Sequence, residues 1–221
     1  MFAVAPDFDL VFSADDRLRH FPRHGGRGFF TATIPGALRA VDVAVAAGAG
    51  VDSEIMTDYF RLDFGIDTRT CRYHNIYGPQ GTWDGGREKA PAAVSRKVAQ
   101  AVVSGKHEIE IWGDGEQTRS FTYIDDCITG MNLVWEKGDP RPINLGSDEM
   151  VTINQLVDIV ESIAGITLKR NYKLDAPQGV RGRNSDNAMI REVLGWAPSI
   201  SLADGLEKTY AWIYDQVKAR G

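Results

Sequence analysis

The sequence predicts an α/β fold, because segments with the pattern of β-strands alternate along the chain with segments that have the pattern of α-helices. The chain has 221 residues, of which 43% are hydrophobic and 25% are charged. This composition is typical of a globular protein and excludes a disordered, collagen-like or solenoid architecture. The length is sufficient for one or two domains with a sizeable core.

Three segments have the residue pattern of strands. Residues 67–74 (DTRTCRYH) run up to a chain break at Gly78-Pro79, residues 108–112 (EIEIW) alternate between charged and apolar side chains, and residues 142–145 form a short strand pattern. An alternation with a period of two is typical of a strand that has one buried face.

Helices are predicted from apolar spacing and from residues that cap helix ends. Ser53 is a candidate N-cap of a first helix that Gly65 ends, and Thr152 with Gln155 has the pattern of a capping box. The apolar face of the first helix would consist of Ile55, Met56, Tyr59 and Phe60. The other predicted helices are 90–104, 124–135, the one that Thr152 opens, one from Ser185 or Asp186 to Gly195, and 201–217.

Charge and cysteine content narrow the class of protein. The formal net charge of −5 argues against a nucleic-acid-binding protein. The two cysteines, Cys71 and Cys127, form no metal-binding motif and no disulfide framework. No apolar run approaches the ~20 residues that a membrane span needs, and no signal-peptide pattern begins the chain. The expected location is therefore the cytoplasm.

Three polar, glycine-rich clusters are candidates for ligand binding. They are residues 72–79 (RYHNIYGP) with 81–91 (GTWDGGREKAP), residues 112–126 (WGDGEQTRSFTYIDD), and residues 179–186 (GVRGRNSD). The first runs from the end of a strand into a helix, which is where α/β proteins place ligands. Arginine beside glycine allows a guanidinium and a backbone N–H to approach one anion together.

These motifs resemble the NAD-dependent epimerase/dehydratase family of extended short-chain dehydrogenases/reductases. Residues 75–79 (NIYGP) and 113–119 (GDGEQTR) are similar to its substrate-side signatures. Residues 81–91, 115–126, 144–151 and 179–187 together resemble the GDP-mannose 3,5-epimerases within it. The resemblance covers about residues 53–221. It implies the C-terminal part of a Rossmann-like NAD(P)-binding fold, followed by a smaller α/β substrate-binding domain.

The resemblance also implies a reaction. In this family NAD oxidises C4 of a GDP-hexose, an acid/base pair exchanges the acidified protons on C3 and C5, and the hydride returns. Lys89 corresponds to one member of that pair, and it must be partly desolvated for its pKa to fall. The other member is a cysteine far upstream, which neither Cys71 nor Cys127 matches. The family is homodimeric, although its dimer helices are only partly present in this chain.

Residue by residue, the resemblance implies that Lys89 is catalytic and that the GDP-sugar lies among Asn75, Glu88, Lys89, Ala90, Lys97, Gln117, Thr118, Arg119 and Arg183. Ordinary structural roles remain the alternative. Lys89 would then be a solvated lysine at a helix start, Arg119 and Arg183 partners of surface salt bridges, and Asn75 a turn residue. His74 is a weak cofactor-binding candidate and more plausibly a packing residue; no metal site is expected.

The family's NAD-binding elements are missing. Its Tyr-x-x-x-Lys pair should fall at positions 46 and 50, which hold Ala46 and Gly50. Residues 24–30 (HGGRGFF) resemble a dinucleotide-binding turn, but no apolar strand precedes them and Pro35 interrupts the helix that should follow. NAD is therefore implied by the family alone.

Residues 1–52 are expected to be a separate, atypical segment. Up to Ser53 the chain contains no Lys, Glu, Asn, Gln, Tyr, Trp or Cys, which favours a truncated gene or a shifted reading frame. The chain is therefore interpreted as a GDP-mannose 3,5-epimerase by ancestry, with negligible turnover by itself. The alternatives are another nucleotide-sugar dehydratase or decarboxylase, and a non-catalytic remnant that binds nucleotide-sugars.

Overall fold

The computed structural model describes residues 29–33, 39–44, 49–176 and 181–220, with the backbone alone described before Glu54. The chain divides into two compact units. Unit 1 contains the residues up to Tyr73 together with Cys127–Leu145 and Asp186–Pro198, and unit 2 contains His74–Asp126, Gly146–Ser185 and Ser199–Gly221.

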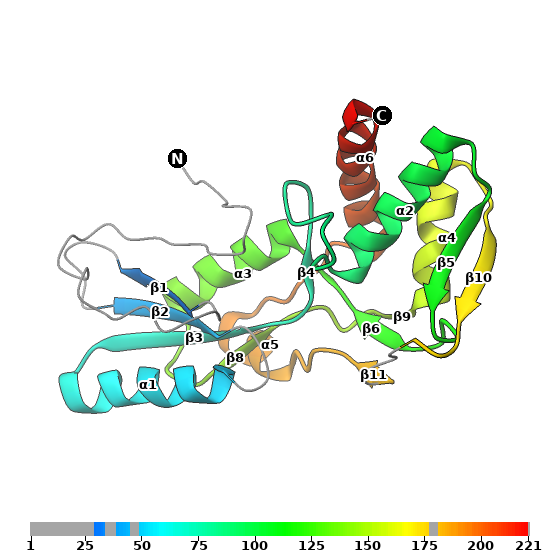
Figure 1. Cartoon of the computed structure of the whole chain (residues 1–221). Helices are drawn as coiled ribbons and strands as arrows, with labels where there is room; N and C mark the ends of the chain where they lie inside the picture. The colour runs from blue at the N-terminus through cyan, green and yellow to red at the C-terminus, as the bar shows by residue number, and fades with distance from the viewer. Residues whose placement is uncertain (1–28, 34–38, 45–48, 177–180, 221) are drawn as a thin grey trace. The chain divides into compact units, whose positions relative to one another are not determined.

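Unit 1 is built on one four-stranded sheet in the order β1-β2-β3-β8. β2, β3 and β8 are parallel, and β1 pairs antiparallel with β2. α1 packs against β2 and β3, as Figure 1 shows, and α5 packs against β8. The bounds are β1 Phe29–Thr33, β2 Arg39–Ala44, α1 Ala49–Phe64, β3 Asp67–Tyr73, α3 Ile124–Lys137, β8 Ile143–Leu145 and α5 Ala188–Leu194.

Two sequence predictions for α1 are wrong. The helix begins at Ala49, so Ser53 lies inside it and does not cap it. The side chains of Ile55, Met56 and Tyr59, expected to face inward, are 61%, 51% and 48% exposed. The side of α1 that is buried carries Thr57 instead, whose carbonyl accepts a hydrogen bond from the Thr68 hydroxyl at 3.3 Å. Apolar spacing identifies one face of a helix, but it does not say what covers that face.

The rest of unit 1 follows the predictions closely. β3 ends one residue before the expected His74, and Cys71 at its centre is fully buried. Burial raises the pKa of Cys71 to about 12, so the thiol remains protonated and structural. α5 begins after Asn187, later than Ser185 or Asp186. The Asp186 carboxylate accepts the N–H of Ala188, the first helical residue.

Unit 2 packs three helices against small sheets. β5 pairs parallel with β10, β6 lies between β11 and β9, and β4 pairs with β7. The predictions for residues 90–104 and 108–112 are confirmed to the residue. The bounds are β4 Ile76–Tyr77, α2 Ala90–Ser104, β5 Glu108–Trp112, β6 Thr118–Ser120, β7 Thr122–Tyr123, β9 Met150–Thr152, α4 Ile153–Ala164, β10 Lys169–Lys173, β11 Gly182–Arg183 and α6 Leu202–Arg220.

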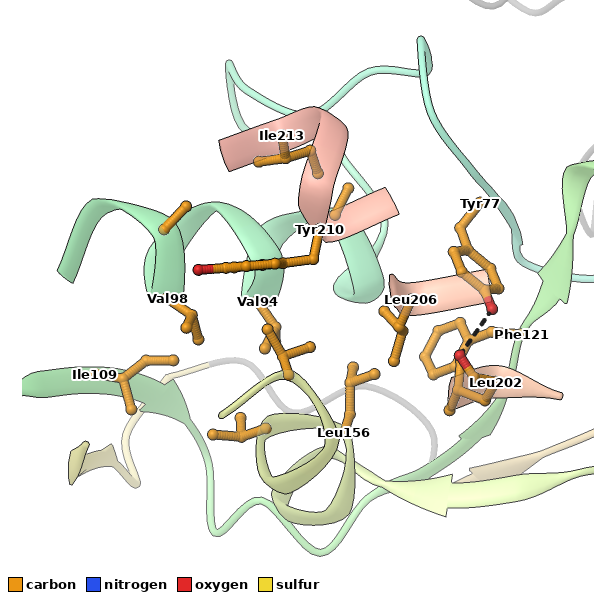
Figure 2. Packing of buried hydrophobic residues seen from close by; sticks show 14 of the residues in the cluster. Tyr77, Val94, Val98, Ile109, Phe121, Leu156, Leu202, Leu206, Tyr210 and Ile213 are labelled. Atoms are coloured by element: carbon orange, nitrogen blue, oxygen red, sulfur yellow. Dashed lines mark hydrogen bonds between the residues drawn. The ribbon is translucent and has the colours of Figure 1, made fainter. Parts of the chain in front are cut away.

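The core of unit 2 lies where α2, α4 and α6 meet. Val98, Leu156 and Leu206, one from each helix, are fully buried (Figure 2). At one side of this core, the Tyr77 hydroxyl donates a hydrogen bond to the carbonyl of Leu202 at 3.2 Å. Burying each of these aliphatic side chains stabilises the fold by about 1.5–3 kcal/mol.

Local capping agrees with the sequence. The capping box of Thr152 and Gln155 is present at the start of α4, and both reciprocal hydrogen bonds form. Gly195 ends α5 in the left-handed conformation. None of the helices that the structure describes is long and apolar enough to cross a membrane.

Candidate functional site

Two arginines of the predicted site lie side by side on adjacent strands of unit 2. β11 pairs parallel with β6, and the register places Arg183 directly opposite Arg119. Neighbouring strands are about 4.8 Å apart, and residues opposite each other in a parallel pair project to the same side of the sheet. Among the described residues no carboxylate forms an ion pair with either guanidinium; that of Arg119 donates to the Thr118 carbonyl at 2.6 Å. Two adjacent unpaired cations are suited to an anion such as a diphosphate.

Asn75 lies next to this arginine pair. Its side-chain amide donates to the carbonyl of Ser120 at 2.9 Å, and its own carbonyl accepts the N–H of Thr122 at 3.2 Å. Its φ of 41° is in the left-handed region, which asparagine tolerates better than most residues. These contacts attach Asn75, the second residue after β3, to the end of β6, one residue beyond Arg119.

His74 lies beside Asn75 and is also fixed by contacts of its backbone and side chain. Its carbonyl accepts a hydrogen bond from the Thr122 hydroxyl at 2.9 Å, and a Cβ added at Gly146 would lie 2.5 Å from the His74 Cβ. Burial lowers the pKa of His74, and the positive charge of Arg183 lowers it further. The imidazole is therefore biased towards its neutral form beside the arginine pair.

Gln117 and Thr118 lead into β6 and are themselves tied to the surrounding backbone. The Gln117 amide donates to the Trp112 carbonyl at 3.2 Å, while its carbonyl oxygen Oε1 is buried with no partner among the described residues. The N–H and hydroxyl of Thr118 both point to the carbonyl of Arg181, at 2.9 and 3.3 Å.

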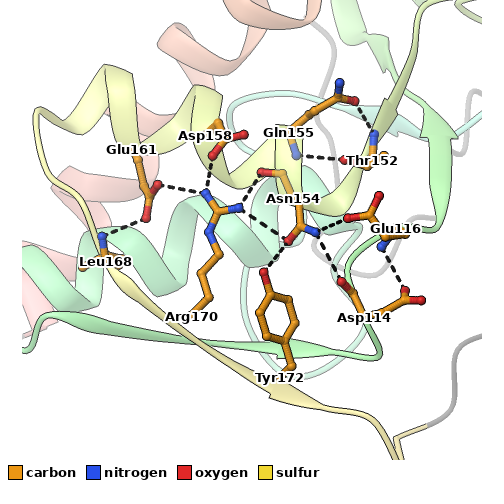
Figure 3. A network of polar contacts seen from close by, with 10 residues as sticks. All are labelled: Asp114, Glu116, Thr152, Asn154, Gln155, Asp158, Glu161, Leu168, Arg170 and Tyr172. Carbon is orange, nitrogen blue, oxygen red and sulfur yellow. Dashed lines mark hydrogen bonds and ion pairs between the residues drawn. The ribbon is translucent and has the colours of Figure 1, made fainter.

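A polar network fixes the turn that precedes these residues (Figure 3). The side-chain amide of Asn154 donates to the Glu116 carboxylate at 2.6 Å and to the carbonyl of Asp114 at 3.2 Å. Arg170 reaches the same asparagine from β10 and forms ion pairs with Asp158 and Glu161. The network joins α4 to the 113–116 turn, which leads into β6.

The remaining predicted residues lie on α2 or immediately before it. Lys89 occupies the N-cap position with an extended backbone and an exposed side chain, and Ala90 is the first helical residue. The desolvation expected for Lys89 is therefore absent in this structure. Two helical turns on, the half-buried Lys97 donates to the carbonyl of Glu110 at 2.8 Å. Burial lowers the pKa of Lys97, and the charge of Glu110 opposes this effect.

The carboxylate of Glu88 is almost completely buried, with 5% of the side chain exposed. It forms an ion pair with Arg96 at 2.6 Å. Burial raises the pKa of Glu88, but backbone hydrogen bonds and the Arg96 guanidinium outweigh it, so the pKa lies below its usual value. Arg96 was not predicted from the sequence. Its contact with Glu88 depends on how the preceding loop folds back, and no sequence motif indicates that.

The structure thus gathers the predicted residues into two groups. Asn75, Gln117, Thr118, Arg119 and Arg183 surround β6, and Glu88, Lys89, Ala90 and Lys97 lie on the first half of α2 or just before it. Within the described ranges, no hydrogen bond or ion pair joins the two groups directly. Two surface cavities, of about 350 and 290 Å³, are lined by residues 158–167 and by residues of unit 1, and neither includes a predicted site residue.

Comparison with known proteins indicates the class of protein. Residues 51–146 match the NAD dependent epimerase/dehydratase family, so this part of the chain is similar to a domain of that family. Within it, the chain is similar to GDP-mannose 3,5-epimerase 1 of Oryza sativa subsp. indica, with 48% identity over 166 residues, or 75% of this chain and 43% of that protein. The chain therefore spans less than half the length of this relative.

Solved structures agree with the Rossmann-like assignment. UDP-glucose 4-epimerase of Thermotoga maritima, solved with UDP-glucose, matches with a TM-score of 0.69 and 30% identity over 76% of this chain and 53% of that one. UDP-glucuronic acid 4-epimerase of Bacillus cereus, solved with UDP-glucuronic acid and NAD, matches with a TM-score of 0.63 and 28% identity over 76% and 52% of the two chains.

The NAD site that the family name implies falls largely on residues outside the described ranges. Gly50 is the second residue of α1 and has no side chain with which to hold a ribose. Ala46, residues 24–28 of the glycine-rich run, and Gly179 of the third polar cluster lie outside the described residues. Among the side chains that are described, no group of three or more His, Cys, Asp or Glu is arranged to hold a metal ion.

Proposed function

We propose that this chain is a nucleotide-sugar epimerase of the GDP-mannose 3,5-epimerase type, and that by itself it binds the GDP-sugar without appreciable turnover. The observation that carries the proposal is the pairing of Arg119 with Arg183 on adjacent strands, with no acidic partner in the described part of the chain. The 48% identity to GDP-mannose 3,5-epimerase supports the choice of substrate.

In the proposed complex the arginine pair binds the diphosphate, because two guanidinium groups provide bidentate donors in fixed planes. Asn75, Gln117 and Thr118 line the adjoining surface, and Lys97 adds positive charge. Lys89 is the proposed acid/base group for the protons on C3 and C5. Such protons become acidic only after C4 is oxidised, and no described side chain of this chain carries out that oxidation, so low turnover is expected.

Binding and turnover test the two halves of the proposal separately. The thermal unfolding midpoint is measured with GDP-mannose, UDP-glucose and dTDP-glucose, and incorporation of deuterium at C3 and C5 of GDP-mannose is followed in D₂O. GDP-mannose at 100 times its Kd should stabilise the fold by about 2.7 kcal/mol, and exchange should be negligible. A larger shift with UDP-glucose would favour the second candidate, an epimerase, dehydratase or decarboxylase acting on UDP-sugars, which the T. maritima match supports.

The proposal extends to partners and organisation. The proposed location is the cytoplasm and the proposed assembly is a homodimer, supported by the exposed apolar residues of α1, such as Leu62 and Phe64 at 69% and 61%. We further propose that residues 1–52 form a segment unrelated to the family. In support, the family match begins at residue 51. Translating the gene in its other two reading frames tests this proposal. If neither frame encodes a Tyr-x-x-x-Lys helix, the idea of a shifted reading frame is contradicted.

A further inference from the structure

The loop between β4 and Lys89 is held by one arginine from the helix that follows it. We propose that Arg96 of α2 is the positioning residue for this loop and so determines where Lys89 stands. The inference rests on the proposed function for the role of Lys89, but the contacts that support it are independent of any ligand.

Arg96 reaches the loop at three points. Its Nε donates to the carbonyl of Trp83 at 3.1 Å and lies 3.7 Å from the Asp84 carboxylate, while its Nη2 bonds the Glu88 carboxylate at 2.6 Å. A single planar guanidinium thus spans six residues of loop and ends next to Lys89. A lysine has one compact charged group and cannot make these three contacts at once.

The burial of the ion pair makes it different from a surface salt bridge. The side chains of Arg96 and Glu88 are 18% and 5% exposed. Exposed ion pairs contribute little, but a buried carboxylate that loses its cation is left uncompensated. One oxygen of the Glu88 carboxylate pairs with Arg96, while the other, Oε2, is buried with no partner among the described residues. Glu88 is thus part of the contact by which Arg96 holds the loop.

The outer side of the same loop is attached to α6. The Arg220 guanidinium lies 4.3 Å from the centre of the Trp83 ring and 3.0 Å from the Asp84 carboxylate. Trp83 also meets Trp212 edge to face, with ring centres 6.4 Å apart. Because these outer contacts involve more exposed groups, Arg96 is assigned the main positioning role.

The test uses Arg96→Lys, which keeps the positive charge but removes the planar guanidinium with its several N–H donors. Arg170→Lys is the matched control, because Arg170 forms a comparable pair with Glu161, with side chains 20% and 9% exposed, on β10. Both are made with Arg87→Cys, an exposed loop position that accepts a spin label while Cys71 and Cys127 stay buried. Electron paramagnetic resonance reports loop mobility without ligand, and calorimetry gives the Kd for GDP-mannose.

Arg96→Lys should sharpen the spin-label spectrum and weaken GDP-mannose binding about tenfold. Arg170→Lys should lower the unfolding midpoint comparably and leave the spin-label spectrum unchanged. An unchanged spectrum in Arg96→Lys, or equal effects of both variants, overturns the inference. If the spectrum responds as expected but the unsubstituted chain binds no GDP-mannose, the positioning of the loop stands and the proposed function is wrong. The double variant Glu88→Gln/Arg96→Gln, which leaves no unpaired buried charge, should also mobilise the label; an immobile label would overturn the inference.

Discussion

At the scale of residues, the arrangement of Arg119 and Arg183 is unfavourable for the free chain. Like charges directly opposite each other on neighbouring strands destabilise a sheet. His74, half-buried beside them, is biased to its neutral form by burial and then by Arg183. A bound diphosphate would relieve the repulsion between the two guanidinium groups. The same repulsion that destabilises the free site would therefore favour binding of the anion.

Arg183→Gln tests this coupling. Removing the positive charge should raise the pKa of His74 part of the way to its ordinary value, because burial remains, and should weaken GDP-mannose binding at least tenfold, about 1.4 kcal/mol. A histidine whose pKa is lowered by folding makes the unfolded chain bind more protons, so stability is lost as the pH falls below about 6.5. That loss should be smaller in the variant.

Imidazole signals in NMR titrations and thermal unfolding across this pH range are the measurements. Arg181→Gln is the control, because Arg181 is 84% exposed and pairs with Asp114 at 3.3 Å. An equal change of the His74 pKa in the control would show that the arginine facing His74 had been misidentified.

At the scale of elements, close approaches between helices and strands determine the core of unit 2. A Cβ added at Gly205 of α6 would lie 2.7 Å from the Tyr123 ring and 3.0 Å from Cζ of Tyr77. Both tyrosines belong to the short β4 and β7 pair. The small residue in α6 therefore allows the helix to pack directly on the strand pair that follows Asn75.

Gly205→Ala should destabilise the protein by about 1–3 kcal/mol through overpacking. In an exposed helical position the same change would stabilise by about 1 kcal/mol, so the sign of the effect separates the two environments. Urea unfolding gives the free energy, and Glu207→Ala on the exposed side of α6 is the control, expected to stay within about 0.5 kcal/mol of the unsubstituted chain. A stabilised Gly205→Ala would contradict the packing described above.

At the scale of the whole molecule, the chain combines two units of different character. Unit 2 buries its helices well, whereas α1 of unit 1 exposes Ile55, Leu62 and Phe64 at 61%, 69% and 61%. Exposed apolar patches of this kind are typical of surfaces that another protein covers. The proposed homodimer would bury them against a second copy.

Sedimentation equilibrium checks the association. The chain should dimerise, and Leu62→Glu should weaken the dimer at least tenfold, about 1.4 kcal/mol, because a charge would be buried at the contact. Leu174→Glu serves as the control, since Leu174 is similarly exposed, at 66%, but belongs to unit 2. A monomer at all concentrations, or equal effects of the two substitutions, would contradict a dimer formed through α1.

Local features of the fold could be read from the sequence because they depend on neighbouring residues. The limits of α2 and β5, the capping box of Thr152 and the stop at Gly195 follow from spacing and capping within one helical turn. The short strands β4, β6, β7, β9 and β11 were not predicted, since runs of two or three residues carry too little periodic signal. The longer strands β1, β2 and β10 were not predicted either.

The amino-acid sequence alone determined the α/β class, the family resemblance and the set of candidate site residues, because motifs such as NIYGP and GDGEQTR are contiguous and their chemistry belongs to the residues themselves. Only the tertiary structure placed Arg183 opposite Arg119, left the apolar side of α1 exposed and paired Glu88 with Arg96. Each of these depends on which distant segment covers or pairs with a residue. That choice is made by the packing of the whole fold, and local patterns carry no information about it.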